Sequence, residues 1–246
     1  YDGDVMTIYL MLTAVIAGLV QGTTGFGLGI VMMLVLPFFL PLASSAAVTN
    51  FISLPLCLFL YLRYRKEVNH KLLILPTLFY IVGSSLAILL IPYINQYLLK
   101  IFFSLFLIGL SIYFLKFATT FQIRASLTTM IVTGVLSGIC DGLFGIGGPL
   151  MVVFYLALVP TKEAYLGSIQ GLFLLVGIYN IIFRIYRGIF TINLLQPSLF
   201  ISVAVLLGML IANRIVNRIN HDLIRQLTYC FIGLSGVITL LTTLFI

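Results

Sequence analysis

Two glycine-rich strings contain the residues whose types and spacing could carry chemistry. The first reads QGTTGFGLG at 21–29, and the second reads DGLFGIGGP at 141–149. Glycine adopts left-handed backbone angles and allows close backbone approach, so each string predicts a break inside a helical segment. A half-helix would then begin near Leu28–Ile30 and near Gly148–Leu150, where Pro149 suits the first turn. Free N–H groups at a helix N-terminus bind anions, so the two strings together predict a compact oxyanion site.

The candidate anion-binding residues combine both strings with neutral polar side chains from elsewhere in the chain. They are Gln21, Gly22, Thr23, Thr24, Gly25, Phe26, Gly27, Asn50, Gly142, Gly145, Ile146, Gly147, Gly148, Pro149, Ser168 and Gln170. A packing interpretation stays open for the outer glycines, such as Gly22 and Gly142, because glycines four residues apart often mark close helix packing. A dinucleotide-binding fingerprint is excluded, since no strand is predicted before either string and the surrounding sequence is apolar.

The composition places these strings in an integral membrane protein. Hydrophobic residues make up 62% of the 246-residue chain and charged residues 8%, whereas soluble domains average about 45–50% and about 25%. Too few polar side chains remain to cover a water-facing surface, and disorder is excluded because it needs low hydrophobicity. The apolar runs are long and do not alternate with polar residues. They therefore exclude an outer-membrane barrel and predict an all-α, polytopic bundle of membrane helices.

Ten apolar segments are predicted along the chain. They lie at 5–21, 27–40, 43–63, 71–91, 96–116, 124–141, 145–159, 162–184, 192–212 and 222–245. The second and seventh follow the glycine-rich strings and reach only ~21–23 Å of a hydrocarbon core of ~30 Å, so they are predicted to be arms of broken or re-entrant hairpins. Basic residues such as Arg63, Arg65 and Lys66 fall in loops on one side, and the positive-inside rule then places both termini outside.

The two halves of the sequence repeat each other. Glycines of the first string recur 120 positions further on, as Gly25 does at Gly145, and Asn50 maps to Gln170 at the same offset. The predicted units are a first membrane repeat at 1–118, a linker at 119–123 and a second membrane repeat at 124–246, all within one membrane domain. Each repeat holds an odd number of segments, so the second copy would enter the membrane from the opposite side. Such inverted-topology repeats predict alternating access around a site between the copies.

Asp141 is a carboxylate placed well inside an apolar segment. An ionisable group inside a membrane is costly and is therefore a functional candidate. Asp141 could carry a coupling proton, help to bind Na⁺ with the carbonyl end of its helix, or pair with a cation such as Arg184. Gln21 stands at the matching position of the first string, so the charge is not a symmetric structural need. Arg184 and Arg187 could also attract an anion near the external mouth or reach to the membrane interface.

Both strings resemble motifs of the sulfite exporter TauE/SafE family of membrane permeases. The resemblance rests on GTTGFGLG at 22–29 and on GLFGIGGP at 142–149, and the chain length and the two similar halves support it. The FGIGGP core is the more specific motif, whereas the first string has Leu28 where family members often have a further glycine. The resemblance implies a multi-pass inner-membrane protein that moves small sulfur-containing anions such as sulfite or sulfonates, often outward.

The sequence therefore predicts a secondary transporter that exports a small anion, sulfite or an organosulfonate, from a bacterial or archaeal cell. The expected partners are this anion and the lipid bilayer, with H⁺ or Na⁺ as the candidate coupling ion. A passive anion channel is the alternative, because broken helices also build channel filters. An enzyme is not expected, since the sequence offers no nucleophile–base pair or metal cluster. No cofactor, bound metal or nucleic acid is expected either, because basic membrane loops account for the net charge of +7.

Overall fold

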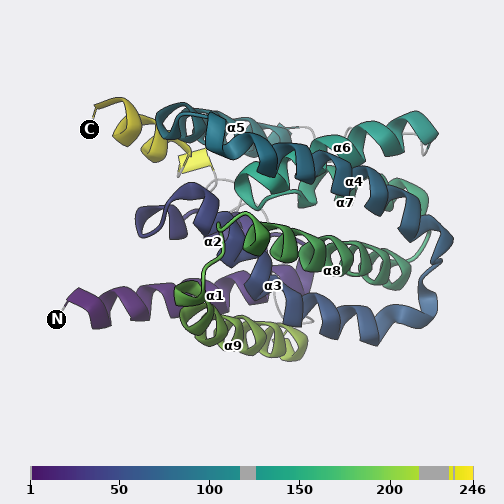
Figure 1. The fold of residues 1–246 in the computed structure, drawn as a ribbon. Coiled ribbons are helices and arrows are strands. Elements are labelled where there is room, and N and C mark those ends of the chain that lie inside the picture. The colour runs from purple at the N-terminus through teal and green to yellow at the C-terminus, as the bar shows by residue number, and fades with distance from the viewer. Residues whose placement is uncertain (1, 117–125, 216–232, 235, 246) are drawn as a thin grey trace. The chain divides into compact units, whose positions relative to one another are not determined.

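The computed structural model describes residues 2–116, 126–215, 233–234 and 236–245. The main helices are α1 (Asp2–Thr24), α2 (Leu28–Met33), η1 (Leu36–Phe38), α3 (Leu42–Tyr64), η2 (Arg65–Glu67), α4 (Lys71–Leu90), η3 (Ile91–Tyr93), α5 (Gln96–Lys116), α6 (Leu127–Phe144), α7 (Gly148–Leu158), α8 (Lys162–Tyr186) and α9 (Ile192–Ile215) (Figure 1). A short apolar helix, Gly236–Phe245, lies near the end of the chain. No strand is assigned among the described residues, so the predicted all-α fold class is confirmed.

Seven of the described helices are long and apolar enough to cross a membrane: α1, α3, α4, α5, α6, α8 and α9. By contrast, α2 has 6 residues and α7 has 11, which corresponds to about 9 Å and 17 Å at 1.5 Å per residue. Neither helix could cross a hydrocarbon core of ~30 Å. Each of these helices begins at the end of a glycine-rich string, where the sequence analysis predicted a short apolar segment. The protein is a multi-pass membrane protein, and two of its described short helices, α2 and α7, begin at the glycine-rich strings.

The order of the helices is consistent with the predicted repeat. The ends of α1 and α6, at Thr24 and Phe144, lie 120 residues apart. The starts of α2 and α7, at Leu28 and Gly148, keep the same offset. The starts of α3 and α8 keep it as well. The opposite orientation of the two copies stays a prediction.

The described helices form two compact units. The first unit consists of α1–α4 and α6–α9, so it draws on both halves of the sequence and contains both glycine-rich strings. The described helices of the second unit are η3, α5 and Gly236–Phe245, and Gly236 packs against Leu107 and Ile108 of α5. The division of the chain into repeats at 1–118 and 124–246 stays a prediction about the sequence.

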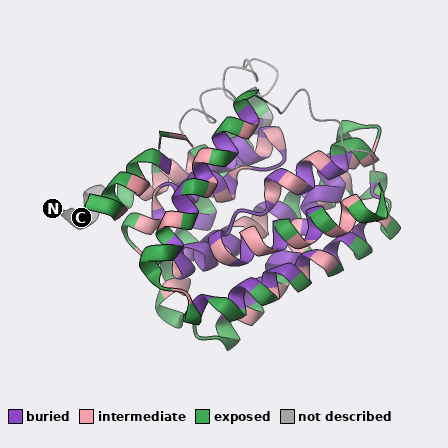
Figure 2. Ribbon diagram, turned by 90° about the horizontal axis from the view of Figure 1, so that it is seen from above, coloured by how far each residue is buried: buried purple, intermediate pink, exposed green. Residues whose placement is uncertain are grey.

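The first unit has an apolar interior and an apolar exterior. The short helix α2 lies in its core, where Leu28 and Met32 are fully buried. Figure 2 shows exposed residues along the outer faces of the helices, and on α4 these include Leu78 and Val82. Such faces would be costly in water and match the hydrocarbon of a bilayer.

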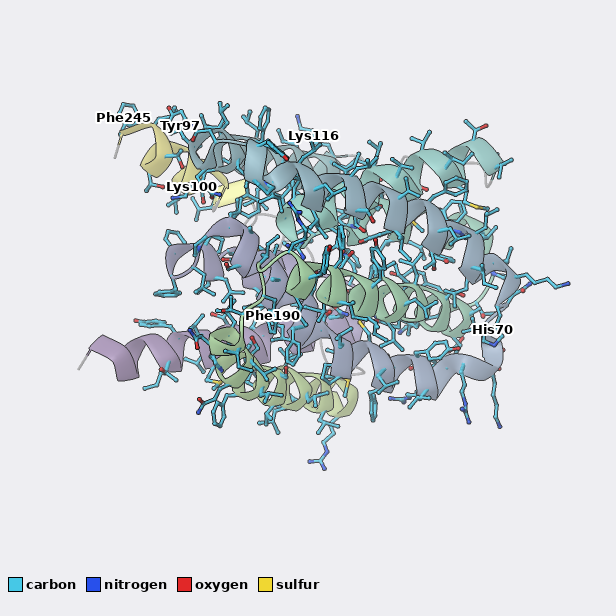
Figure 3. The ribbon with its side chains drawn as sticks, viewed as in Figure 1. His70, Tyr97, Lys100, Lys116, Phe190 and Phe245 are labelled. Carbon is cyan, nitrogen blue, oxygen red and sulfur yellow. The ribbon has the colours of Figure 1, made fainter. Side chains whose placement is uncertain are left out.

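Basic residues gather at one end of the first unit. Arg65 of η2 is exposed, and so is His70 just before α4 (Figure 3). The exposed Lys162 begins α8 at the same end, because Gly167 of that helix packs against Tyr64 at the end of α3. By the positive-inside rule this common end is predicted to face the cytoplasm, and that orientation stays a prediction.

Two pairs of helices approach closely through glycine. A Cβ atom on Gly18 of α1 would collide with the carbonyl group of Val205 on α9. Likewise, a Cβ atom on Gly138 of α6 would collide with the carbonyl group of Tyr80 on α4 (Figure 1). Because α9 follows α4 by one repeat, the two pairs are equivalent. Each pair joins the first helix of one half to the fourth helix of the other.

Replacing Gly138 by leucine should lower the free energy of unfolding by about 1–3 kcal/mol, because the side chain would force α4 and α6 apart. Thermal unfolding of the detergent-solubilised protein measures this loss. The matched control is Gly109→Leu on α5, where an added Cβ meets no atom within 4 Å. We expect the control to unfold close to the wild-type temperature. An equal loss in both variants would contradict the close packing of α4 on α6.

Candidate functional site

The first glycine-rich string forms a break between α1 and α2. Gly25 and Gly27 have left-handed φ angles of 83° and 109°, which other residues rarely adopt. The Gln21 side chain bridges the break, because its Oε1 accepts a hydrogen bond of 3.2 Å from the Leu28 N–H at the start of α2. The Thr24 hydroxyl donates to the carbonyl oxygen of Phe26 within the turn. The break that the sequence predicted is therefore present and has its own hydrogen bonds.

The second string forms the equivalent break between α6 and α7. Gly145 has a φ angle of 65°, and its N–H donates a hydrogen bond of 2.8 Å to the carbonyl oxygen of Asp141. The helix α7 begins at Gly148 with Pro149 in its first turn, as predicted. Proline is favoured there because its missing N–H would have no partner within the helix.

The two breaks approach each other inside the first unit. An added Cβ on Gly29 would lie 2.5 Å from the carbonyl oxygen of Gly145. An added Cβ on Gly148 would lie 3.4 Å from Phe26. The backbone of α2 therefore packs directly against the end of α6, and only glycine at position 29 permits this approach.

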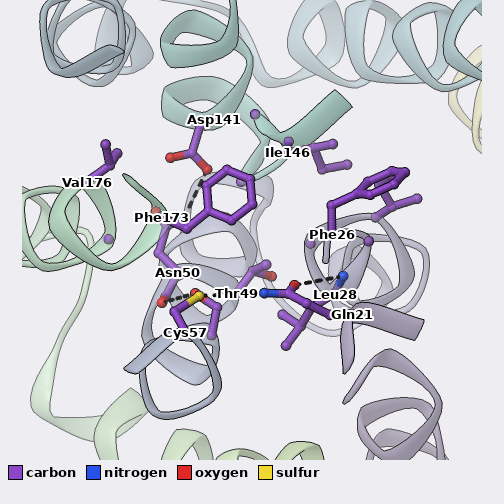
Figure 4. A pocket seen from close by; sticks show the side chains of 18 of the residues that line it. Gln21, Phe26, Leu28, Thr49, Asn50, Cys57, Asp141, Ile146, Phe173 and Val176 are labelled. Carbon is purple, nitrogen blue, oxygen red and sulfur yellow. Dashed lines mark hydrogen bonds between the residues drawn. The ribbon is translucent and has the colours of Figure 1, made fainter. Parts of the chain in front are cut away.

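A cavity of about 60 Å³ lies where the breaks meet. Its lining consists of Gln21, Phe26, Gly27, Leu28, Gly29, Ile30, Thr49, Asn50, Ser53, Cys57, Tyr80, Asp141, Gly145, Ile146, Gly147, Gly148, Pro149, Phe173, Val176 and Gly177. Figure 4 shows Gln21 and Asp141 facing this space from different helices, with Thr49 and Asn50 of α3 between them. Since one water needs about 10–15 Å³, the cavity has room for about four to six waters, or for small ions of the same total volume.

Two polar pairs at equivalent positions of the repeat link the halves beside the cavity. Asn50 Nδ2 donates to Asp141 Oδ1 at 3.0 Å, and Gln21 Nε2 donates to Gln170 Oε1 at 3.3 Å. Each pair joins the first helix of one half to the third helix of the other. Gln170 Nε2 also donates to the carbonyl oxygen of Gly25 at 2.7 Å, so this pair holds the first break in place.

The Asp141 carboxylate is surrounded by hydrogen-bond donors. Besides Asn50, Asn180 of α8 donates from Nδ2 to Oδ2 at 2.6 Å, and Ser84 of α4 donates to Asn180 Oδ1 at 2.9 Å. The Tyr80 hydroxyl also reaches the carboxylate. A deprotonated carboxylate only accepts hydrogen bonds, so these donors serve the charged form of Asp141.

Arg184 is fully buried at the end of α8, which excludes the predicted alternative that its side chain reaches to the membrane interface. Its guanidinium donates to the main-chain carbonyl oxygens of Ala43, Asp141 and Gly142, at 2.8–3.2 Å. Two of these carbonyls belong to the last turn of α6, where a helix carries partial negative charge. Arg184 therefore caps α6 just behind the Asp141 side chain, whereas Arg187 is exposed.

A family model described as sulfite exporter TauE/SafE matches residues 10–239 of the chain. The chain belongs to this family. No curated protein and no solved structure gives a significant match. A TauE/SafE protein is a membrane transport protein, and the family is one of transporters rather than enzymes. The seven apolar helices described above agree with this assignment.

Four of the seven candidate glycines line the cavity between the two breaks. Of the candidate residues, those that line the cavity are Gln21, Phe26, Gly27, Asn50, Asp141, Gly145, Ile146, Gly147, Gly148 and Pro149. Those that do not line it are Gly22, Thr23, Thr24, Gly25, Gly142, Ser168, Gln170 and Arg184. An added Cβ on Gly22 would meet α9 and one on Gly142 would meet α4, which are helix-packing positions. The binding role of every candidate stays a prediction.

Several residues of the site were not among the candidates. Thr49, Ser53, Cys57 and Tyr80 contribute polar atoms to the lining, and the further lining residues are Leu28, Gly29, Ile30, Phe173, Val176 and Gly177. Asn180 supports Asp141 from outside the lining. A signal for it existed, because it lies four residues before Arg184 in an apolar helix and therefore on the same helix face.

Proposed function

We propose that this TauE/SafE protein exports a small oxyanion, sulfite or a small organosulfonate, by alternating access at the cavity between the two helix breaks. One observation carries this proposal: a cavity of about 60 Å³ is lined by the starts of two short helices from opposite halves of the chain. Helix starts present N–H groups and partial positive charge to an anion. The small volume favours sulfite over sulfonates with long tails.

The start of α7 is the stronger anion-binding element of the two. Gly147 and Gly148 line the cavity, so the positive end of the 11-residue helix faces it. At the start of α2, by contrast, the Leu28 N–H already donates to Gln21 Oε1. The hydroxyl group of Thr49 would supplement the backbone donors of α7.

Asp141 makes anion binding conditional. Its carboxylate lines the same small cavity, and two like charges about 4–5 Å apart repel by about 3–4 kcal/mol at an effective dielectric constant of about 20. Arg184 does not line the cavity, and its guanidinium already donates hydrogen bonds to three main-chain carbonyl oxygens, so it does not bind the anion directly. The anion would therefore bind when a cation, H⁺ or Na⁺, compensates Asp141, which makes Asp141 the candidate coupling residue.

Alternating access would use the two polar pairs that cross between the halves. If one half rocks against the other, the pair of Asn50 with Asp141 and the pair of Gln21 with Gln170 are the contacts beside the cavity that must shift. The repeat supplies the required symmetry, because exchange of the roles of two inverted copies would convert an outward-open state into an inward-open one.

Counterflow of radiolabelled sulfite into proteoliposomes tests the proposal. Vesicles preloaded with unlabelled sulfite should take up label above the level of protein-free vesicles, and the rate should saturate with sulfite concentration. Unlabelled methanesulfonate should compete with the label if small sulfonates share the site. Single-channel currents and a rate that does not saturate would instead identify the alternative, a passive anion channel. Absence of exchange for every small oxyanion tried would reject anion transport altogether.

A further inference from the structure

Two buried oxygen atoms in the cavity wall have no hydrogen-bond partner. They are Thr49 Oγ1 and Asn50 Oδ1, on neighbouring residues of α3. Both residues line the cavity, and their exposed fractions are only 2% and 6%. A buried polar atom without a partner lowers stability, so a ligand that contacts both oxygens would be favoured.

The orientation of the Asn50 side chain follows from its neighbour. Its Nδ2 donates to Asp141 Oδ1 at 3.0 Å, and a carboxylate has nothing to donate in return. The amide therefore cannot be reversed while Asp141 is charged, and Oδ1 remains as a buried acceptor without a partner. Around this point the wall presents an amide oxygen, a hydroxyl oxygen and a carboxylate, all from residues that line the cavity.

Oxygen ligands of this kind suit a hard cation, and a single carboxylate suits a monovalent one. The carbonyl end of α6 adds to the same region, because Gly145 lines the cavity directly after that helix. Half-helix ends and unwound backbone carbonyls hold Na⁺ in other transporters built from broken helices. Among the described residues no group of three or more His, Cys, Asp or Glu side chains could hold a transition metal.

We propose that Asp141, Asn50 and Thr49 form a Na⁺ site, and that Na⁺ bound there is required for the anion to enter the cavity beside it. This inference rests on the anion site proposed above and names the ion that compensates Asp141. The bound Na⁺ would satisfy both unpaired oxygens and neutralise the carboxylate. By linkage, the anion would then raise the affinity for Na⁺ by the same factor as Na⁺ raises the affinity for the anion.

A proton serves this geometry less well. Both oxygens of the Asp141 carboxylate already accept hydrogen bonds from amide groups, one from Asn50 and one from Asn180. Protonation would displace one donor and leave the free oxygen of Thr49 without a partner. The other titratable or charged groups near Asp141 are Tyr80 on α4, Cys57 on α3, Cys140 on α6 and Arg184 on α8.

The test is Na⁺ binding by the purified full chain in detergent, without any sulfur anion. Thermal unfolding is followed while NaCl replaces choline chloride at constant ionic strength, and KCl replaces it in a parallel series. We expect the melting temperature to rise with Na⁺ in a saturable way and to respond much less to K⁺. A wild-type protein that unfolds at the same temperature in all three salts would overturn the proposal.

Two variants locate the ion. Asp141→Asn removes the charge, and Thr49→Val removes the hydroxyl at nearly constant volume, so both should abolish most of the Na⁺-dependent shift. The matched control is Thr133→Val on α6, a buried threonine outside the cavity whose hydroxyl bonds to its own helix. The control should keep the wild-type shift. If Asp141→Asn does not fold, Thr49→Val still decides, because an unchanged Na⁺ shift in that variant overturns the site.

Sulfite counterflow separates failure of the Na⁺ site from failure of the proposed function. Replacing Na⁺ by choline on both sides of the vesicle membrane should lower the rate at low sulfite by about tenfold or more. Equal exchange in both media would overturn the Na⁺ requirement and leave sulfite transport intact. A Na⁺-dependent melting shift without any sulfite exchange would instead preserve the ion site and reject the anion. Stabilisation by acid that depends on Asp141, with no response to Na⁺, would identify a proton site and overturn the proposal.

Discussion

Replacement of Arg184 by methionine should lower the free energy of unfolding by about 3–5 kcal/mol, the range seen when one member of a buried charged group is removed. Arg184 is fully buried and donates to three main-chain carbonyls, two of them in the last turn of α6. Methionine fills a similar space but cannot donate. The three carbonyls would lose their charged donor, and the negative charge of Asp141 would lose its nearest compensating cation.

A double variant separates the charge from the cap. Asp141→Asn in the Arg184→Met background removes the uncompensated charge and should recover part of the lost stability. Arg184→Lys keeps the charge but cannot reach three carbonyls as a planar guanidinium does, so we expect an intermediate loss. The melting temperature in detergent measures all four proteins, and a loss of roughly 10 °C or more is expected for Arg184→Met. The control is Arg187→Met, at an exposed position. If it lowers the melting temperature as much as Arg184→Met does, capping of α6 by Arg184 does not stabilise the fold.

The sequence predicted the parts of the site that depend on local backbone conformation. Gly25, Gly27 and Gly145 have the left-handed φ angles that such glycines predict, and Pro149 lies in the first turn of α7. The composition predicted the membrane helices because lipid-facing surfaces must be apolar. Each of these features depends on the residue itself and on its near neighbours in the sequence.

The repeat offset carried the prediction one step further. The 120-residue offset makes Asn50 equivalent to Gln170, and Gln21 equivalent to Asp141. Asn50 forms a hydrogen bond with Asp141, and Gln170 forms the equivalent hydrogen bond with Gln21. The repeat in the sequence therefore identified the four residues of these two pairs, Gln21, Asn50, Asp141 and Gln170. It did not identify which side chains would bond to each other, because each pair joins different halves of the chain.

The remaining residues depend on packing between distant segments. Tyr80 reaches the cavity only because α4 packs closely on α6 through Gly83 and Gly138. Arg184 and Arg187 look alike in the sequence, near the end of one apolar segment, yet one is buried and the other exposed. Which side of the helix end faces the protein interior decides this difference, and no local sequence pattern predicts that direction.

Replacement of Gly29 by valine should reduce sulfite exchange by at least tenfold, while the protein remains folded. Gly29 lies where α2 meets the second break, and an added Cβ would stand 2.5 Å from the carbonyl oxygen of Gly145. The larger side chain must separate the two breaks or enter the cavity, and such overpacking costs about 1–3 kcal/mol. About 1.4 kcal/mol placed on the anion-bound state is already a tenfold loss.

Initial rates of sulfite counterflow measure the effect of Gly29→Val, and size-exclusion chromatography of the same preparations checks that it folds. The matched control is Gly109→Val on α5, where an added Cβ meets no atom and which lies outside the cavity. It should exchange sulfite at the wild-type rate. Because the breaks form the anion site only if they touch, wild-type exchange by a folded Gly29→Val protein would mean that the anion binds elsewhere. A loss of exchange confined to Gly29→Val would place the transported anion next to the contact between α2 and α6.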